Sequence, residues 1–216
     1  MEDNRVYAII AILILILIFV VFIFTSGDIK EAVVSEEVLS QGWYEDVEER
    51  FNDSNLFGLE KHISLTYKFD SNIFPSFLTV NTYKTIFMMN EEDLFEETVE
   101  TIKNSMQEKN VILDNGSAKE GYRVLKNKHK TTYIVYNGTR EDINEEIKVI
   151  GETWNCRDSG TSIIAIGYAQ ITNNSEKNLS NWAKIIKDKS NTFSFYSNDG
   201  YIFLGKDGLI FNIECH

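Results

Sequence analysis

The longest apolar run lies near the start of the chain. From Val6 to Phe24 the sequence reads VYAIIAILILILIFVVFIF, nineteen residues without charge, glycine or proline. At about 1.5 Å per residue, a helix of this length nearly crosses the roughly 30 Å hydrocarbon core of a bilayer. The run predicts a transmembrane helix over residues 6–24, within a tail and anchor of residues 1–25. A cleaved signal peptide is the alternative, but this run is longer than a usual signal core and only Arg5 provides a basic end.

The pattern changes after the anchor. Residues 26–41 are polar and mixed, which predicts a stalk with no fold of its own. Polar and apolar residues then alternate from His62 to Phe69 and again over residues 77–89 (FLTVNTYKTIFMM). This period of two is typical of strands with one buried face.

A helix is predicted to begin after Asn90. Asn90 can cap it, and the acidic residues that follow suit the positive end of the helix dipole. Apolar side chains then recur at helical spacing from Leu94 to Met106, which places them on one face. The helix should end at about residue 108.

The remaining chain predicts an antiparallel sheet and a second helix. Strands are expected at 110–126, 131–138, 146–156 and 161–171, with turns at 127–130, 137–138 (Asn-Gly) and 157–160. A helix is expected over 177–188, followed by two strands at 201–205 and 209–214. The predicted fold class is therefore α+β: an N-terminal transmembrane helix, then one domain over residues 42–216 in which a twisted antiparallel sheet packs with two helices.

A family resemblance rests on this element order and on three stretches of sequence. They are IKVIGETWNC, SGTSIIAIGYAQIT and the ending LIFNIECH. Over about residues 43–216 the chain resembles membrane-anchored proteins of methanogenic archaea that carry a PsbP/MOG1-like domain. The resemblance implies a PsbP/MOG1-like sandwich and a binding or accessory role, and it carries over no site residues.

Charge and modification signals bear on location. The net charge of −12 disfavours binding to nucleic acid or to anionic lipid surfaces. A short N-terminal tail, only two cysteines and five Asn-x-Ser/Thr sequons favour a domain outside the cytoplasm, in an oxidising compartment. The candidate glycosylation sites are Asn52, Asn115, Asn137, Asn173 and Asn178.

The stretch with the strongest resemblance to an enzyme motif is DSGTS, residues 158–162. A similar string surrounds the catalytic aspartate of retroviral-type aspartic proteases, in which two such aspartates share a proton. Here Asp158 follows Asn155, Cys156 and Arg157 instead of an apolar strand, and the motif occurs once. Asp, Ser and Gly are also the residues that a tight turn selects, so we interpret the string as a turn.

The two cysteines, Cys156 and Cys215, are the candidates for one disulfide. Closing a loop of about 60 residues would stabilise the fold by about 4 kcal/mol on the chain-entropy model. Three alternatives stay open: free or buried thiols, a nucleophilic Cys156, and a metal site in which both cysteines join His216 and either His62 or His129. Without a paired CxxC motif the metal signal is weak, so no metal and no cofactor are expected.

Together these patterns predict a function. No phosphate-binding loop, EF-hand, HExxH or GxSxG motif is found in the sequence. The expected protein is a membrane-anchored, non-catalytic extracytoplasmic module that contacts the membrane through residues 6–24. It would bind a protein partner in the envelope or a small ligand. The alternative is a surface hydrolase or thiol-dependent enzyme that uses Asp158 or Cys156.

Overall fold

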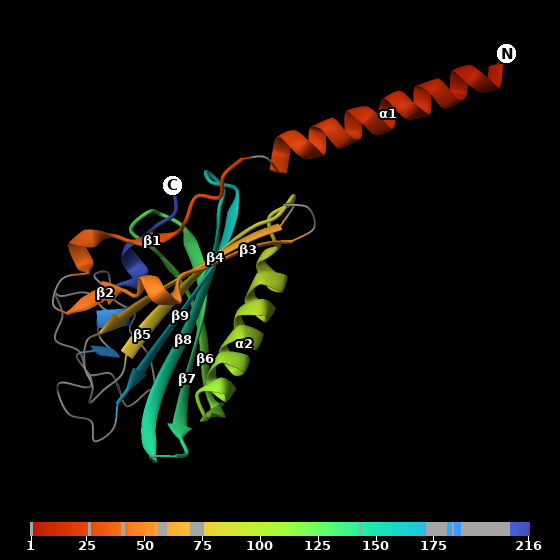
Figure 1. Cartoon of the computed structure of the whole chain (residues 1–216). Helices are drawn as coiled ribbons and strands as arrows, with labels where there is room; N and C mark the ends of the chain where they lie inside the picture. Colours follow the sequence, from red (N-terminus) through yellow and green to blue (C-terminus); the bar gives the residue numbers. More distant parts are fainter. Residues whose placement is uncertain are drawn as a thin grey trace.

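A computed structural model describes most of the chain (Figure 1). The described residues are 2–25, 27–39, 42–55, 60–69, 76–142, 144–171, 181–182, 184–186 and 208–216. The predicted strand at 201–205 and the sequons at Asn173 and Asn178 lie outside these residues.

One antiparallel sheet dominates the domain. Its strands lie in the order β2-β4-β5-β9-β8-β7-β6, and β3 pairs with β4 beside β2. The strands are β2 (Trp43–Glu45), β3 (Phe51–Asn55), β4 (Glu60–Phe69), β5 (Ser76–Lys84), β6 (Val111–Val124), β7 (Lys130–Arg140), β8 (Glu145–Cys156) and β9 (Thr161–Gln170). The predicted central strands are thus confirmed, except that the strand expected over 77–89 ends at Lys84. Strands β2 and β3 were not predicted.

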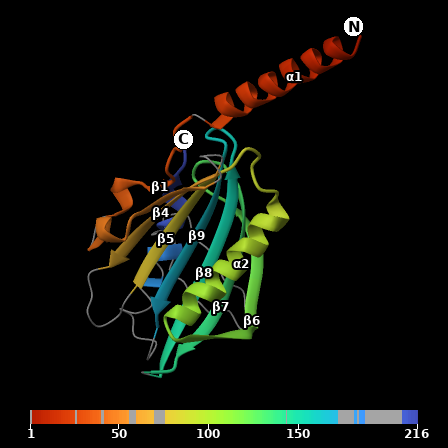
Figure 2. The ribbon, with the colours of Figure 1, turned by 45° about the vertical axis from the view of Figure 1, so that its right-hand side comes forward.

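Helix α2 (Glu91–Glu108) covers one face of the sheet (Figure 2). As predicted, Asn90 caps it: the Asn90 side chain accepts a hydrogen bond of 2.9 Å from the backbone N–H of Asp93. Its buried side chains include Leu94, Ile102 and Met106, which pack with apolar residues of β7, β8 and β9. The apolar face of the predicted amphipathic helix is therefore the face that is buried against the sheet.

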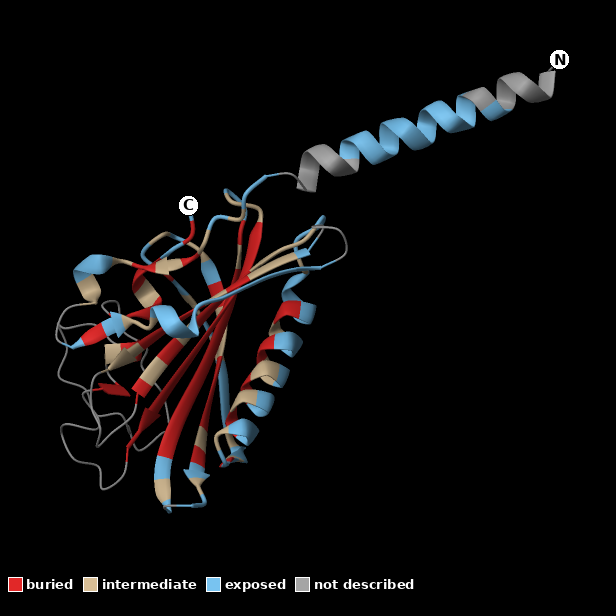
Figure 3. Cartoon of the chain, viewed as in Figure 1, coloured by how far each residue is buried: buried red, intermediate tan, exposed pale blue. Residues whose placement is uncertain are grey.

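The other face of the sheet carries a second core. Of the predicted helix 177–188, residues 181–182 and 184–186 are described and are helical, and Trp182, Ile185 and Ile186 are buried there. In β9, Ile163 belongs to this core and the next residue, Ile164, belongs to the core under α2. All ten residues of β9 are buried because both faces of the strand are covered (Figure 3).

Part of the predicted stalk packs into the domain. Strand β1 (Val33–Val34) pairs with β10 (Ile213–Glu214) in a small second sheet. The backbone N–H of Ala32 donates to Thr82 Oγ1, and that of Val34 donates to the Tyr67 hydroxyl, both at 3.0 Å. Short 3-10 helices η1 (Glu36–Val38), η2 (Val47–Glu49) and η5 (Ile210–Asn212) complete the described elements. Helix η5 and the short β10 replace most of the strand predicted at 209–214.

The predicted transmembrane helix is corrected by the structure. Residues Glu2–Thr25 form helix α1, which extends away from the sheet (Figure 1). The side chains from Ile9 to Val20 are exposed. In the described part of the chain, no helix combines the length and the apolar character that a bilayer crossing requires. The expected fold class is therefore wrong about the N-terminal transmembrane helix.

The predicted turn at Asn137-Gly138 is also wrong. Both residues lie inside β7, where they pair with Lys148 and Ile147 of β8. A side chain at Gly138 would lie 3.0 Å from the backbone oxygen of Ile112, so this glycine permits close approach of β6 instead of a turn. The chain reverses instead after Arg140, where Asn144 adopts a φ of 51°.

Two glycines fix how closely the helical segments approach the sheet. A methyl group at Gly151 would lie 2.5 Å from Ile102 Cδ1 of α2, and one at Gly167 would lie 2.5 Å from Ile185 Cγ2. We expect Gly151→Ala and Gly167→Ala each to lower the free energy of unfolding by about 1–3 kcal/mol, because the added methyl group overpacks the core. Chemical denaturation checks this, with Gly116→Ala in the exposed part of β6 as the control. Equal effects in all three variants would contradict the close-packing argument.

Candidate functional site

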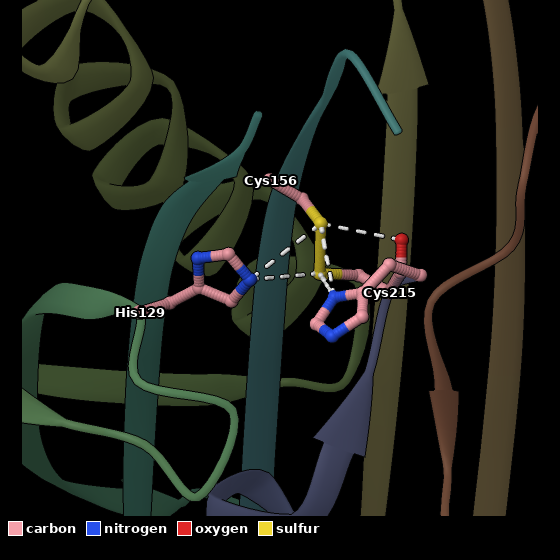
Figure 4. Close-up of side chains that lie close together, drawn as sticks. His129, Cys156 and Cys215 are labelled. Carbon is pink, nitrogen blue, oxygen red and sulfur yellow. Dashed lines mark hydrogen bonds between the residues drawn. A yellow bond between two sulfur atoms is a disulfide. The ribbon is translucent and has the colours of Figure 1, made fainter. Parts of the chain in front are cut away.

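Two cysteines and two histidines meet where three chain segments converge (Figure 4). Cys156 is the last residue of β8, and Cys215 and His216 follow β10. His129 lies in the turn between β6 and β7. In sequence, His129 is 27 residues from Cys156 and 86 from Cys215, so only the folded sheet brings the group together.

The turn that carries His129 is held by hydrogen bonds. The N–H of Leu125 donates to the His129 carbonyl at 3.0 Å, and the N–H of Lys128 donates to the Leu125 carbonyl at 2.9 Å. Lys128 itself adopts a positive φ of 68°. The turn also reaches the C-terminal segment, because Asn127 Nδ2 donates to the Ile213 carbonyl at 3.0 Å. These bonds fix His129 relative to Cys215.

Cys156 and Cys215 form a disulfide, as predicted. Their Cα atoms are 6.4 Å apart, and both residues are fully buried. The bond joins the end of β8 to the segment after β10, which otherwise contacts the main sheet through side chains and turns. Neither cysteine is therefore available as a thiol nucleophile in this state.

Both histidines place a ring nitrogen beside the disulfide. His129 Nε2 lies 3.6 Å from Cys156 Sγ and 3.3 Å from Cys215 Sγ. His216 Nδ1 lies 3.8 Å from each sulfur. Burial lowers the pKa of His129, and His216 lowers it further, against a smaller opposing effect of Asp158. Lowering the pKa favours the neutral imidazole, which is the form that can ligate a metal.

Asp158 lies in a turn and belongs to no catalytic pair that the described residues form. Residues 157–160 connect β8 to β9, Asp158 is exposed, and Gly160 adopts a φ of 67°. Ser159 Oγ donates to the Cys156 carbonyl at 3.3 Å and lies 2.6 Å from Thr161 Oγ1. The turn interpretation of DSGTS is confirmed.

A pocket of about 390 Å³ lies on the α2 face of the sheet, beyond the start of that helix. Glu91 and Leu94 of α2 form one side, and the ends of β6, β7 and β8 form the floor. Tyr122 and Val124 line it while remaining 83% and 54% exposed, so the pocket has an apolar edge that nothing in the described chain covers. Thr132, Thr153 and Asn155 add hydroxyl and amide groups.

The pocket wall is fixed by a small hydrogen-bond network. Asn155 Nδ2 donates to the Met89 carbonyl at 2.8 Å, just before α2 begins. Ser162 Oγ donates to Asn155 Oδ1 at 2.6 Å and accepts from the Met89 N–H at 3.2 Å. Strands β8 and β9 thereby position the start of α2 over the sheet. The pocket was not predicted, because it depends on where the helix starts relative to strands that are distant in sequence.

A buried ion pair lies under the opposite face of the same strands. Arg123 Nε donates to Glu152 Oε1 at 2.7 Å, and its second terminal nitrogen bonds the other carboxylate oxygen. Arg123 Nη1 also donates to the Ile186 carbonyl at 3.3 Å. The Glu152 side chain is 0% exposed and that of Arg123 is 10% exposed. This pair fixes β6, β8 and the helical segment at Ile186 to one another.

The described sequons differ in accessibility. Asn52 in β3 and Asn115 in β6 are exposed. Asn137 is partly buried, and its side-chain oxygen accepts a hydrogen bond of 3.0 Å from Lys148 Nζ. A glycan is therefore compatible with Asn52 and Asn115, whereas at Asn137 it would displace a native contact.

Comparisons with known proteins give no family for this chain: no protein-family model, curated protein or solved structure matches it. The resemblance to PsbP/MOG1-like proteins therefore has no matching structure to support it and stays a prediction.

Proposed function

We propose that the domain is a non-catalytic binding module for a small ligand that occupies the pocket beside α2. The observation that carries the proposal is a preformed cavity with an uncovered apolar edge, Tyr122 and Val124, above a floor with hydroxyl and amide groups. Its volume of about 390 Å³ lies within the roughly 300–1,000 Å³ that is usual for small-molecule sites.

The lining suggests the chemical class of the ligand. Tyr122, Val124 and Leu94 suit an apolar or aromatic group, and Thr132 and Asn155 suit a hydrogen-bonding group such as an amide or hydroxyl. The charged residues at the pocket are Glu91, Lys130 and Arg123, and Arg123 is paired with Glu152. The remaining two charges are opposite, which gives little preference for a strongly charged molecule.

An enzymatic function has less support. Asp158 is exposed on a turn, and the sulfur of Cys156 is bonded to that of Cys215. Nucleophilic catalysis would require a free thiolate beside a base, and acid catalysis of the aspartic-protease type would require a second carboxylate.

We also propose that the domain works outside the cytoplasm. The disulfide supports this location, because such bonds persist mainly in oxidising compartments. The exposure of Asn52 and Asn115 is compatible with glycosylation there.

Filling the pocket is expected to abolish binding without unfolding the domain. Thr132→Trp places an indole in the pocket, and Thr139→Trp introduces the same side chain at an exposed position of the same strand. A panel of small aromatic amides and alcohols, screened by ligand-observed NMR, would identify binders and their Kd values. Thr132→Trp should raise each Kd at least about tenfold, which corresponds to about 1.4 kcal/mol, while Thr139→Trp changes it little.

The proposal is contradicted by either of two results. One is that no member of the panel binds the wild-type protein. The other is that binding is equally strong in Thr132→Trp and Thr139→Trp when both variants unfold at the wild-type denaturant concentration.

A further inference from the structure

We propose that His129, Cys156, Cys215 and His216 form a zinc site when the disulfide is reduced, so that one cluster exists in two mutually exclusive states. This inference concerns a site separate from the pocket and does not depend on the proposed binding function. The sequence left His62 and His129 as alternative ligands, and the fold brings His129, not His62, to the cysteines.

The composition of the group suits zinc. Two thiolates and two imidazoles are one of the usual ligand sets for tetrahedral Zn²⁺, and magnesium or calcium would instead require oxygen ligands. The four candidate ligand atoms all lie within 4.8 Å of one another. His62, the third histidine, is excluded because it lies on β4, stacked on Tyr83 with its Nε2 3.1 Å from Asn81 Oδ1.

The distances also fit. With Zn–S of about 2.3 Å and Zn–N of about 2.0–2.1 Å, each nitrogen-to-sulfur edge of a tetrahedron is about 3.6 Å. The four such distances in the structure are 3.3, 3.6, 3.8 and 3.8 Å. Two adjustments remain. The two sulfurs must separate from bonding distance to about 3.8 Å, and the two imidazole nitrogens, which lie within 4.8 Å of each other, must come to about 3.4 Å. Rotation about the side-chain bonds of the cysteines and of the exposed His216 allows both.

The supporting structure is already present around the ligands. Cys156 ends a strand that is paired on both sides, and the turn of His129 is bonded to the segment of Cys215 through Asn127. Three of the four ligands are buried or partly buried and His216 is exposed, so an ion could enter from the side of His216. Because strand pairing and hydrogen bonds already hold these backbone segments in place, the ligands lose little conformational freedom when a metal binds.

The chemistry balances in two steps. First, a dithiol reductant transfers two electrons and two protons to the Cys156–Cys215 bond; the S–S bond breaks, two thiols form, and the reductant becomes its own disulfide. Second, Zn²⁺ binds the two sulfurs and the two neutral imidazoles, and the two thiol protons are released to solvent. In the reverse direction a disulfide oxidant accepts two electrons from the two thiolates and, with two protons from solvent, becomes a dithiol; the Cys156–Cys215 bond re-forms, and the ion loses two of its four ligands and is released.

Zinc alone serves as the probe in the test. The full chain, kept in a mild detergent because α1 exposes apolar side chains, is reduced with a phosphine under argon, and the phosphine is removed. Competition with a chromophoric chelator then measures zinc affinity and stoichiometry. Reduced wild-type protein should bind one Zn²⁺ per chain, and the disulfide form should bind at least about tenfold more weakly.

Matched histidine variants locate the site. His129→Ala and His216→Ala should each weaken zinc binding at least about tenfold, while His62→Ala should leave it unchanged. His216 is exposed, so its variant tests the site without disturbing the core. Substitution of Co²⁺ gives a second readout, because thiolate ligation produces a charge-transfer band that should disappear in a Cys156→Ser, Cys215→Ser variant.

Two results would overturn the inference. One is that reduced wild-type protein with two titratable thiols binds no zinc in competition with the chelator. The other is that His129→Ala and His216→Ala bind zinc as tightly as His62→Ala, which would place the metal elsewhere.

Discussion

Replacing Arg123 with methionine is expected to lower the free energy of unfolding by about 3–5 kcal/mol. The substitution removes the guanidinium group but leaves the carboxylate of Glu152, which is 0% exposed, without its cationic partner. Thr131 Oγ1 still donates to Glu152 Oε1, but one hydroxyl cannot balance a buried charge. Chemical denaturation monitored by tryptophan fluorescence measures the effect.

Two further variants separate charge burial from lost packing. In the Arg123→Met, Glu152→Met protein both charges are absent, so most of the stability should return. Arg50→Met removes an arginine that is 41% exposed and paired with Glu31 and Glu45, and it should cost less than about 1 kcal/mol. A loss in Arg123→Met as small as in Arg50→Met would show that Glu152 does not need Arg123.

Loss of the disulfide is the second large effect. The bond closes a loop with a sequence separation of 59 residues, and on the chain-entropy model its removal costs about 4 kcal/mol. The Cys156→Ala, Cys215→Ala protein should therefore unfold at a lower denaturant concentration than oxidised wild type, in buffer that contains a strong metal chelator. The chelator is needed because zinc bound to reduced protein would itself stabilise the fold.

Reduction gives the internal comparison for this prediction. A phosphine reductant should destabilise the wild-type protein by a similar amount and should not affect the double alanine variant. If reduction leaves the unfolding curve of the wild type unchanged, the disulfide does not stabilise the domain and the C-terminal segment is held by its other contacts.

Local patterns predicted the elements whose structure is determined locally. Asn90 and the periodic apolar residues after it gave α2, because a helix cap and an amphipathic face depend on neighbours within a few turns. The strict alternation from His62 to Phe69 gave β4 for the same reason. Asp158 to Gly160 gave the turn between β8 and β9, because a positive φ at Gly160 suits glycine.

Features determined by distant contacts were missed or mistaken. The Asn137-Gly138 pair has the local preference of a turn, but pairing with β8 and the close approach of β6 keep it in a strand. Val33 and Val34 were assigned to a stalk because their partners lie far along the chain, as in the Val33 and Glu214 pair. The site was similarly incomplete. The cysteine pair could be predicted from its number and context, but the sequence could not choose between His62 and His129, because His129 reaches the cysteines only through the register of β6, β7 and β8.

The covalent link between Cys156 and Cys215 is the claim on which the stability prediction, the proposed location and the two-state metal site all depend. Its most direct test is the intact mass of the unfolded protein after treatment with an alkylating reagent, with and without prior reduction. We predict no alkyl group without reduction and two after it. Two alkyl groups added without reduction would show free thiols, and would contradict both the disulfide and the switch that we derive from it.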